Sequence, residues 1–166
     1  MLRFLDTDIC IAFLRGTSAA VRDRLLRFSR NEVALPAIVV AELHFGAEKS
    51  AEPRRLASRV EEFIQSFEVV SFGRSAARCY ARIRALLEGK GEPIGANDYL
   101  VAATVAAEKG ILVTGNVREF NKVPGLKLEN WLSLKTEMAP DSAGVRSGLV
   151  SLSDRFESSS GICSSR

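Results

Sequence analysis

Short apolar runs alternate with helical patterns from the first residue to about residue 134. Runs bounded by polar or turn-forming residues predict buried strands at residues 2–5, 33–35, 68–70, 111–114 and 126–129. Apolar residues at helical spacing predict helices at residues 9–14, 19–28, 36–49, 56–67, 75–87 and 98–110. Strands that alternate with helices are typical of an α/β fold with a mainly parallel sheet and helices on both faces.

Two polar residues are predicted to begin helices. Asp8 stands directly before the helical pattern of residues 9–14, and Asn97 before that of residues 98–110. A side-chain oxygen at this position can accept a hydrogen bond from one of the free N–H groups of the first turn. We therefore expect Asp8 and Asn97 to act as helix caps.

The composition is that of one globular domain. A chain of 166 residues, with 46% hydrophobic and 26% charged residues, suits a single folded core. The longest apolar run, residues 34–41, contains Pro36 and is much shorter than the roughly 20 residues of a membrane span. No membrane segment and no export signal are visible, so we expect a cytoplasmic protein.

Charge, cysteine content and the C-terminal composition exclude only a few kinds of site and partner. The net charge of +3 permits an acidic partner such as nucleic acid but does not demonstrate one. The three cysteines have no C-x-x-C spacing, which argues against a disulfide framework or a zinc site. Residues 135–166 are rich in Ser and Gly, so we expect a domain over residues 1–134 and a tail that is disordered or weakly docked.

Three carboxylates stand where a charge is costly. Asp6 follows the first strand and should lie at the carboxyl edge of the sheet, where open α/β folds bind ligands. Glu42 and Asp98 lie on the apolar stripes of their helices. A buried carboxylate needs a cation, and the sequence offers no obvious Lys or Arg for each. Any one of them could be a cap or a rim residue, but together they indicate a site for Mg²⁺ or Mn²⁺.

Several short segments then carry a family resemblance. They are residues 5–8 (LDTD), 41–43 (AEL), 46–49 (GAEK), 94–98 (IGAND), 112–120 (LVTGNVREF), 123–126 (VPGL) and 129–131 (ENW). Their order and spacing resemble VapC-type PIN-domain ribonuclease toxins of type II toxin–antitoxin pairs. The resemblance implies a three-layer α/β/α domain that forms a homodimer, cleaves RNA with Mg²⁺ or Mn²⁺ and is inhibited by a small cognate VapB-type antitoxin.

The resemblance also assigns roles by position. Asp6 and Asp98 resemble the metal-binding aspartates of the family, and Glu42 resembles its third essential acid. Many PIN domains carry a fourth acid where this chain has Asn116, which we expect to orient a metal-bound water or a neighbouring acid. Glu119 either reaches inward or faces solvent. Asp8 stands where Asn is common in the family, and Ala96 where Pro is common.

We therefore predict hydrolysis of RNA phosphodiester bonds. A carboxylate-bound Mg²⁺ acidifies water and stabilises charge on the phosphate, with Glu42 as ligand or base and Thr7, Thr114 and Asn116 as supporting residues. Three arginines recur every four residues, and we call them the basic ridge: Arg74, Arg78 and Arg82. The basic ridge could contact phosphates or an acidic antitoxin, or could simply be a solvated face.

Two other functions fit parts of the sequence. A haloacid-dehalogenase-like phosphatase would use Asp6 as nucleophile and Asp8 as acid, but it needs a later paired acidic motif, and none follows residues 111–114. A catalytically inactive PIN-like protein would only bind RNA or its antitoxin, and the presence of all three acids argues against it. The single histidine, His44, excludes a ribonuclease that uses a pair of histidines.

Overall fold

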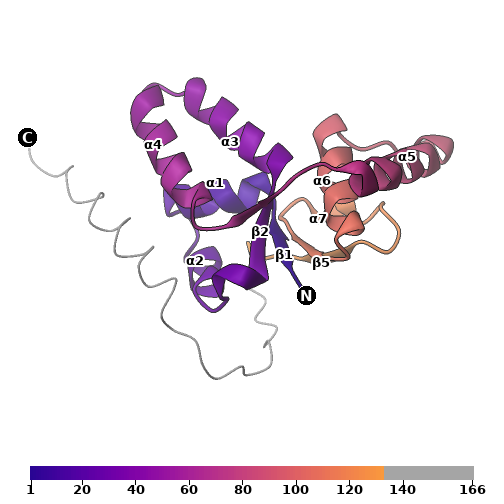
Figure 1. Ribbon diagram of the computed structural model, residues 1–166, viewed down its shortest axis with the longest axis horizontal. Coiled ribbons are helices and arrows are strands. Elements are labelled where there is room, and N and C mark those ends of the chain that lie inside the picture. The colour runs from indigo at the N-terminus through magenta and orange to yellow at the C-terminus, as the bar shows by residue number, and fades with distance from the viewer. Residues whose placement is uncertain (133–166) are drawn as a thin grey trace, which may run out of the picture.

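The computed structural model describes residues 1–132, and its centre is a five-stranded sheet (Figure 1). The strands lie in the order β3-β2-β1-β4-β5, and each of the four pairings is parallel. Their bounds are β1 Arg3–Leu5, β2 Val33–Pro36, β3 Glu68–Val70, β4 Ile111–Val113 and β5 Lys127–Glu129. All five strands were predicted, and the α/β class with a mainly parallel sheet is confirmed.

Helices cover both faces of the sheet, as predicted. One side carries α1 Thr7–Arg15, α2 Ala19–Leu25, α3 Ala37–Glu48 and α4 Pro53–Ile64. The other carries α5 Arg74–Gly89, α6 Ala96–Ala107 and the short α7 Val117–Phe120 (Figure 1). The domain is therefore a three-layer α/β/α structure. No helix within residues 1–132 is both long and apolar enough to cross a membrane.

The three middle strands are apolar because they are buried on both faces. Phe4, Leu5, Val33, Leu35 and Leu112 are fully inaccessible to solvent. Strands of a parallel sheet lack a solvated face, so they appear in the sequence as continuous apolar runs rather than as alternating patterns. This is why such short strands could be recognised in the sequence.

Both predicted helix caps are wrong. The first helix begins at Thr7 and is capped by Asp6, so Asp8 lies inside its first turn. Helix α6 begins at Ala96 after Gly95, so Asn97 lies inside its first turn. Both side chains make contacts far along the chain instead of capping their own helices. A cap forms from local sequence alone, whereas these contacts require the folded domain.

Some smaller elements were not predicted. Helix α7 and a 3-10 turn at Arg30–Glu32 are too short for a hydrophobic period to be visible in the sequence. The predicted helix of residues 19–28 ends at Leu25. The predicted tail of residues 135–166 lies outside the described residues.

A polar and aromatic cluster fastens the edge strand β5 to β1. The Arg3 guanidinium donates to both carboxylate oxygens of Glu129 at 3.1 Å and lies 4.2 Å from the centre of the Phe28 ring. Trp131 donates to Glu129 at 2.9 Å and stacks on Phe28. The cluster fixes the end of β5 and thus supports the neighbouring strand β4, which leads into the carboxylate site.

Candidate active site

The carboxylates gather at the carboxyl edge of the sheet. Strands β1 and β4 are parallel neighbours, so the residues that follow them emerge side by side. The Asp6 N–H donates to the carbonyl oxygen of Val113 at 2.9 Å, which fixes the start of α1 against the end of β4. Residues 6–8 and residues 114–116 therefore face each other across a short distance.

Asp6 is held by a donor from each side of this edge. Its Oδ1 accepts the Thr7 N–H at 2.8 Å, and its Oδ2 accepts the Thr114 hydroxyl at 2.7 Å. The Asp6 residue is only 8% exposed and Thr114 is fully buried. Thr114 in turn accepts the backbone N–H of Asn116 at 2.9 Å, so its hydroxyl is oriented toward Asp6.

Asp8 reaches across to the loop after β4. Its Oδ2 accepts the Gly115 N–H at 2.8 Å. Its Oδ1 is buried and has no hydrogen-bond partner among residues 1–132. A Cβ on residue 115 would lie only 2.6 Å from Asp8 Oδ2 and 2.5 Å from a methyl group of Leu132, so glycine is what permits this approach.

Glu42 projects from α3 and is held by two other helices. Its Oε2 accepts the Thr7 hydroxyl of α1, and its Oε1 accepts the Asn97 side-chain amide of α6 at 2.7 Å. Thr7 therefore contacts two predicted acids, because its backbone N–H serves Asp6 and its hydroxyl serves Glu42.

Asp98 completes the group from the first turn of α6. It is half-buried, and it turns back toward the Gly95 N–H, with Oδ2 3.0 Å from where a Cβ of Gly95 would lie. Glu119 on α7 is close enough for its charge to act on Asp98, and it forms an ion pair with Lys122 at 2.6 Å. The Glu119 side chain thus belongs to the rim of this site.

The carboxylates are electrostatically unfavourable as they stand. Burial raises the pKa of Asp6 to about 6, the charges of Asp8 and Asp98 add to this rise, and the Thr114 and Thr7 hydrogen bonds oppose it. Burial also raises the pKa of Asp98, followed by the charges of Glu42 and Glu119. The pKa of Asp8 is raised by burial and lowered by the Gly115 N–H. The site concentrates negative charge that calls for a cation.

The residues present suit a hard divalent cation. No Arg or Lys within residues 1–132 is ion-paired with Asp6, Asp8, Glu42 or Asp98. The donors are carboxylate oxygens, and one of them, Asp8 Oδ1, is buried without a partner in the described part of the chain. In the part of the chain that is described, however, no three Asp, Glu, His or Cys side chains already stand as a closed metal cage. Each Glu42 oxygen accepts one hydrogen bond, from Thr7 or from Asn97, and keeps a lone pair free.

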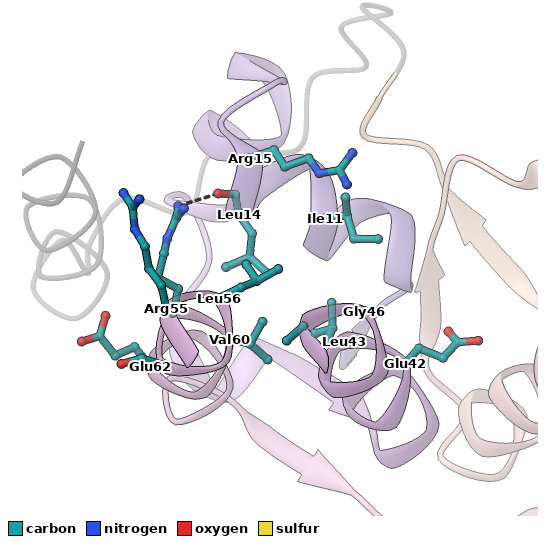
Figure 2. A pocket seen from close by; sticks show the side chains of 13 residues that line it. Ile11, Leu14, Arg15, Glu42, Leu43, Gly46, Arg55, Leu56, Val60 and Glu62 are labelled. Atoms are coloured by element: carbon teal, nitrogen blue, oxygen red, sulfur yellow. Dashed lines mark hydrogen bonds between the residues drawn. The ribbon is translucent and has the colours of Figure 1, made fainter. Parts of the chain in front are cut away.

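Three other features lie outside the carboxylate group. A pocket of about 620 Å³, lined by both apolar and charged side chains, lies between α1, α3 and α4. Glu42 lies at its rim, with its carboxylate turned away from Leu56 and Val60 (Figure 2). The pocket shares only Glu42 with the predicted metal-binding acids. The basic ridge is exposed along α5, and none of its three arginines is ion-paired with a carboxylate of residues 1–132. His44 lies 3.9 Å from Glu61 of α4 and takes no part in the carboxylate group.

The structure adds three residues to those predicted for the site. Asn97 and Asp8 were interpreted as caps, and Gly115 was not considered. One signal was available for Asn97, because it shares the first turn of its helix with Asp98. Asn116, by contrast, contributes its backbone N–H, while its side chain makes no hydrogen bond within residues 1–132.

Comparison with known proteins identifies the family of this chain. Residues 3–126 match the PIN domain family. The chain is 36% identical over 132 residues to Ribonuclease VapC2 of Rickettsia felis and to the tRNA(fMet)-specific endonuclease VapC of Salmonella typhimurium, covering 79% of this chain and 98% and 99% of those proteins. The crystal structure of VapBC2 from Rickettsia felis bound to a promoter DNA fragment matches with a TM-score of 0.75 at 35% identity, over 79% of this chain and 99% of that one. The chain therefore belongs to the PIN-domain family, and within it to the VapC type.

Proposed function

We propose that this chain is a ribonuclease that hydrolyses RNA phosphodiester bonds with Mg²⁺ or Mn²⁺, and that it is the toxin of a toxin–antitoxin pair. The observation that carries the proposal is the buried Asp6, which lies at one sheet edge with Asp8, Glu42 and Asp98 and forms no ion pair with an Arg or Lys of residues 1–132. Relatives named as a ribonuclease and as an endonuclease support the nuclease activity.

Asp6, Asp98 and Glu42 are the residues that would hold the ion. A bound divalent cation supplies a more acidic water and stabilises negative charge on the scissile phosphate. Asp6 is oriented for this role by Thr7 and Thr114, which leave lone pairs of both its oxygens available. Glu42 either ligates the ion or accepts a proton from the attacking water at Oε1 or Oε2, and Thr7 and Asn97 hold its carboxylate in place.

The solved structures of relatives support an antitoxin as partner. Solved structures of VapBC complexes from Rickettsia felis and Salmonella typhimurium match this chain with TM-scores of 0.75. We therefore propose a small VapB-type antitoxin as the physiological inhibitor. We propose that the basic ridge contacts RNA phosphates or acidic residues of that antitoxin. The homodimer stays a prediction of the family resemblance.

The test is RNA cleavage by the full chain purified free of antitoxin. We expect cleavage of total RNA with Mg²⁺ or Mn²⁺, none in EDTA, and at least a hundredfold loss in Asp6→Asn and Asp98→Asn. Asp23→Asn is the matched control, because this aspartate is exposed on α2 and lies outside the site. Cleavage that persists in EDTA, or full activity in both site variants, would reject the metal-dependent mechanism. Metal binding without cleavage of any RNA would favour the binding-only alternative.

A further inference from the structure

We propose that Asp8 is a fourth acidic residue of the metal site in this chain, and that it supplies the charge which Asn116 lacks. This inference rests on the proposed function, because it concerns how strongly the same site binds a divalent cation. The family resemblance of the sequence implies an acid at the position of Asn116, and Asn where this chain has Asp8. The two departures from the family pattern would then compensate each other.

The contacts of Asp8 hold its carboxylate against the loop that follows β4. The Gly115 N–H fixes Oδ2 at 2.8 Å, and Oδ1 is buried with no hydrogen-bond donor from residues 1–132. A buried carboxylate oxygen without a partner is costly, and a cation or a cation-bound water would satisfy it. Gly115 permits this contact because any side chain there would collide with Asp8 Oδ2.

The carboxylate of Asp8 lies beside that of Asp6. Asp6 Oδ2 accepts the Thr114 hydroxyl and Asp8 Oδ2 accepts the N–H of the next residue, Gly115, so both carboxylates reach the same two residues after β4. A negative charge at this position strengthens the binding of a cation by Asp6. Removing it should relieve repulsion in the metal-free protein and weaken metal binding at the same time.

The topology explains how residues 8 and 116 could exchange this role. Asp8 lies three residues beyond the end of β1, and Asn116 lies three residues beyond the end of β4. The two strands are parallel neighbours, so both positions meet at one edge. Asn116 is exposed and its side chain makes no hydrogen bond within residues 1–132, so an aspartate there would be tolerated.

A simpler role for Asp8 would be to stabilise the N-terminus of α1 through the helix dipole. An acid in the first turn contributes about 0.3–1 kcal/mol in this way. That role predicts that Asp8→Asn lowers stability and leaves metal affinity unchanged. The metal-site role predicts that Asp8→Asn raises the stability of the metal-free protein and weakens metal binding. The helix-dipole role predicts lower stability and unchanged metal binding.

The experiment is calorimetric titration of the full chain with Mn²⁺. We compare the wild type with Asp8→Asn, with the Asp8→Asn/Asn116→Asp double variant, and with the control Asp23→Asn. Asparagine at position 8 can still accept the Gly115 N–H, so the contact is kept while the charge is lost. We expect Asp8→Asn to weaken Mn²⁺ binding about 10- to 100-fold, the double variant to recover most of the loss, and the control to change binding less than about twofold.

Each other outcome overturns the inference. Wild-type affinity in Asp8→Asn, or a failure of Asn116→Asp to restore it, rejects the exchange of roles. Melting in EDTA shows that the variants fold, and a lower melting temperature for Asp8→Asn with unchanged Mn²⁺ affinity supports the helix-dipole role instead. If the wild type binds no Mn²⁺, the metal-dependent function fails together with this inference. RNA cleavage is measured separately, so a loss of nuclease activity alone does not affect the result.

Discussion

Replacing Asp6 by asparagine should stabilise the metal-free protein at alkaline pH. Asp6 is buried among carboxylates, and its pKa is raised from 3.8 to about 6. The folded state therefore holds a proton on Asp6 more tightly than the unfolded state does. Below about pH 3.8, ionisation of Asp6 does not lower the free energy of unfolding. The full decrease is reached once the pH has risen above about 6. Asparagine removes this charge and keeps an oxygen for the Thr7 N–H.

The magnitude follows from the two pKa values. Their difference of about two pH units, at about 1.4 kcal/mol per unit, gives an upper value of about 3 kcal/mol. The asparagine amide replaces the carboxylate as the partner of the Thr114 hydroxyl, a weaker bond that reduces the gain. We therefore expect Asp6→Asn to raise the free energy of unfolding by about 1–3 kcal/mol at pH 8, and by much less at pH 4.5.

Urea unfolding in EDTA at both pH values measures this effect. Asp23→Asn serves as the control, because an exposed aspartate should change stability by less than about 0.5 kcal/mol at either pH. Adding Mn²⁺ should then stabilise the wild type and leave Asp6→Asn nearly unchanged. An Asp6→Asn protein that is less stable than the wild type at pH 8 would refute the view that Asp6 carries an uncompensated charge.

Three further results follow from the structure. Asn97→Ala removes the donor to Glu42, so RNA cleavage should slow about tenfold or more while the unfolding free energy changes by less than about 0.5 kcal/mol. Cleavage at the wild-type rate would show that this contact is dispensable. Arg3→Met breaks the paired hydrogen bonds to Glu129 and should cost about 1.5–3 kcal/mol in urea unfolding, whereas a loss near zero would mean that the cluster does not hold β5. Glutamine at all three positions of the basic ridge should reduce the slope of RNA affinity against salt by about 2, and an unchanged slope would place RNA elsewhere.

The sheet and its order along the chain were predictable because parallel strands are buried on both faces. Each strand is a short apolar run, and residues 68–70 were predicted with the observed bounds. Helix ends were less predictable, since α1 begins at Thr7 and α6 at Ala96, each before the residue expected to cap it. A polar residue near a helix start can serve its own helix or a distant partner, and local sequence does not distinguish the two.

The candidate site was predictable in its acids but not in its supporting contacts. Asp6 was recognised because a charge directly follows a buried strand, and Glu42 because it lies on an apolar stripe. The Asn97 amide and the Gly115 N–H act across 55 and 107 residues of chain. Such contacts depend on which strands are neighbours, so they require the three-dimensional fold.

Diffraction from crystals of the full chain grown with Mn²⁺ tests the central claim most directly, because anomalous scattering locates the ion without reference to activity. We predict a peak at about 2.0–2.2 Å from carboxylate oxygens of both Asp6 and Asp98, with Glu42 turned toward it. A peak elsewhere, or none at this edge of the sheet at millimolar Mn²⁺, would contradict the proposed metal-dependent site.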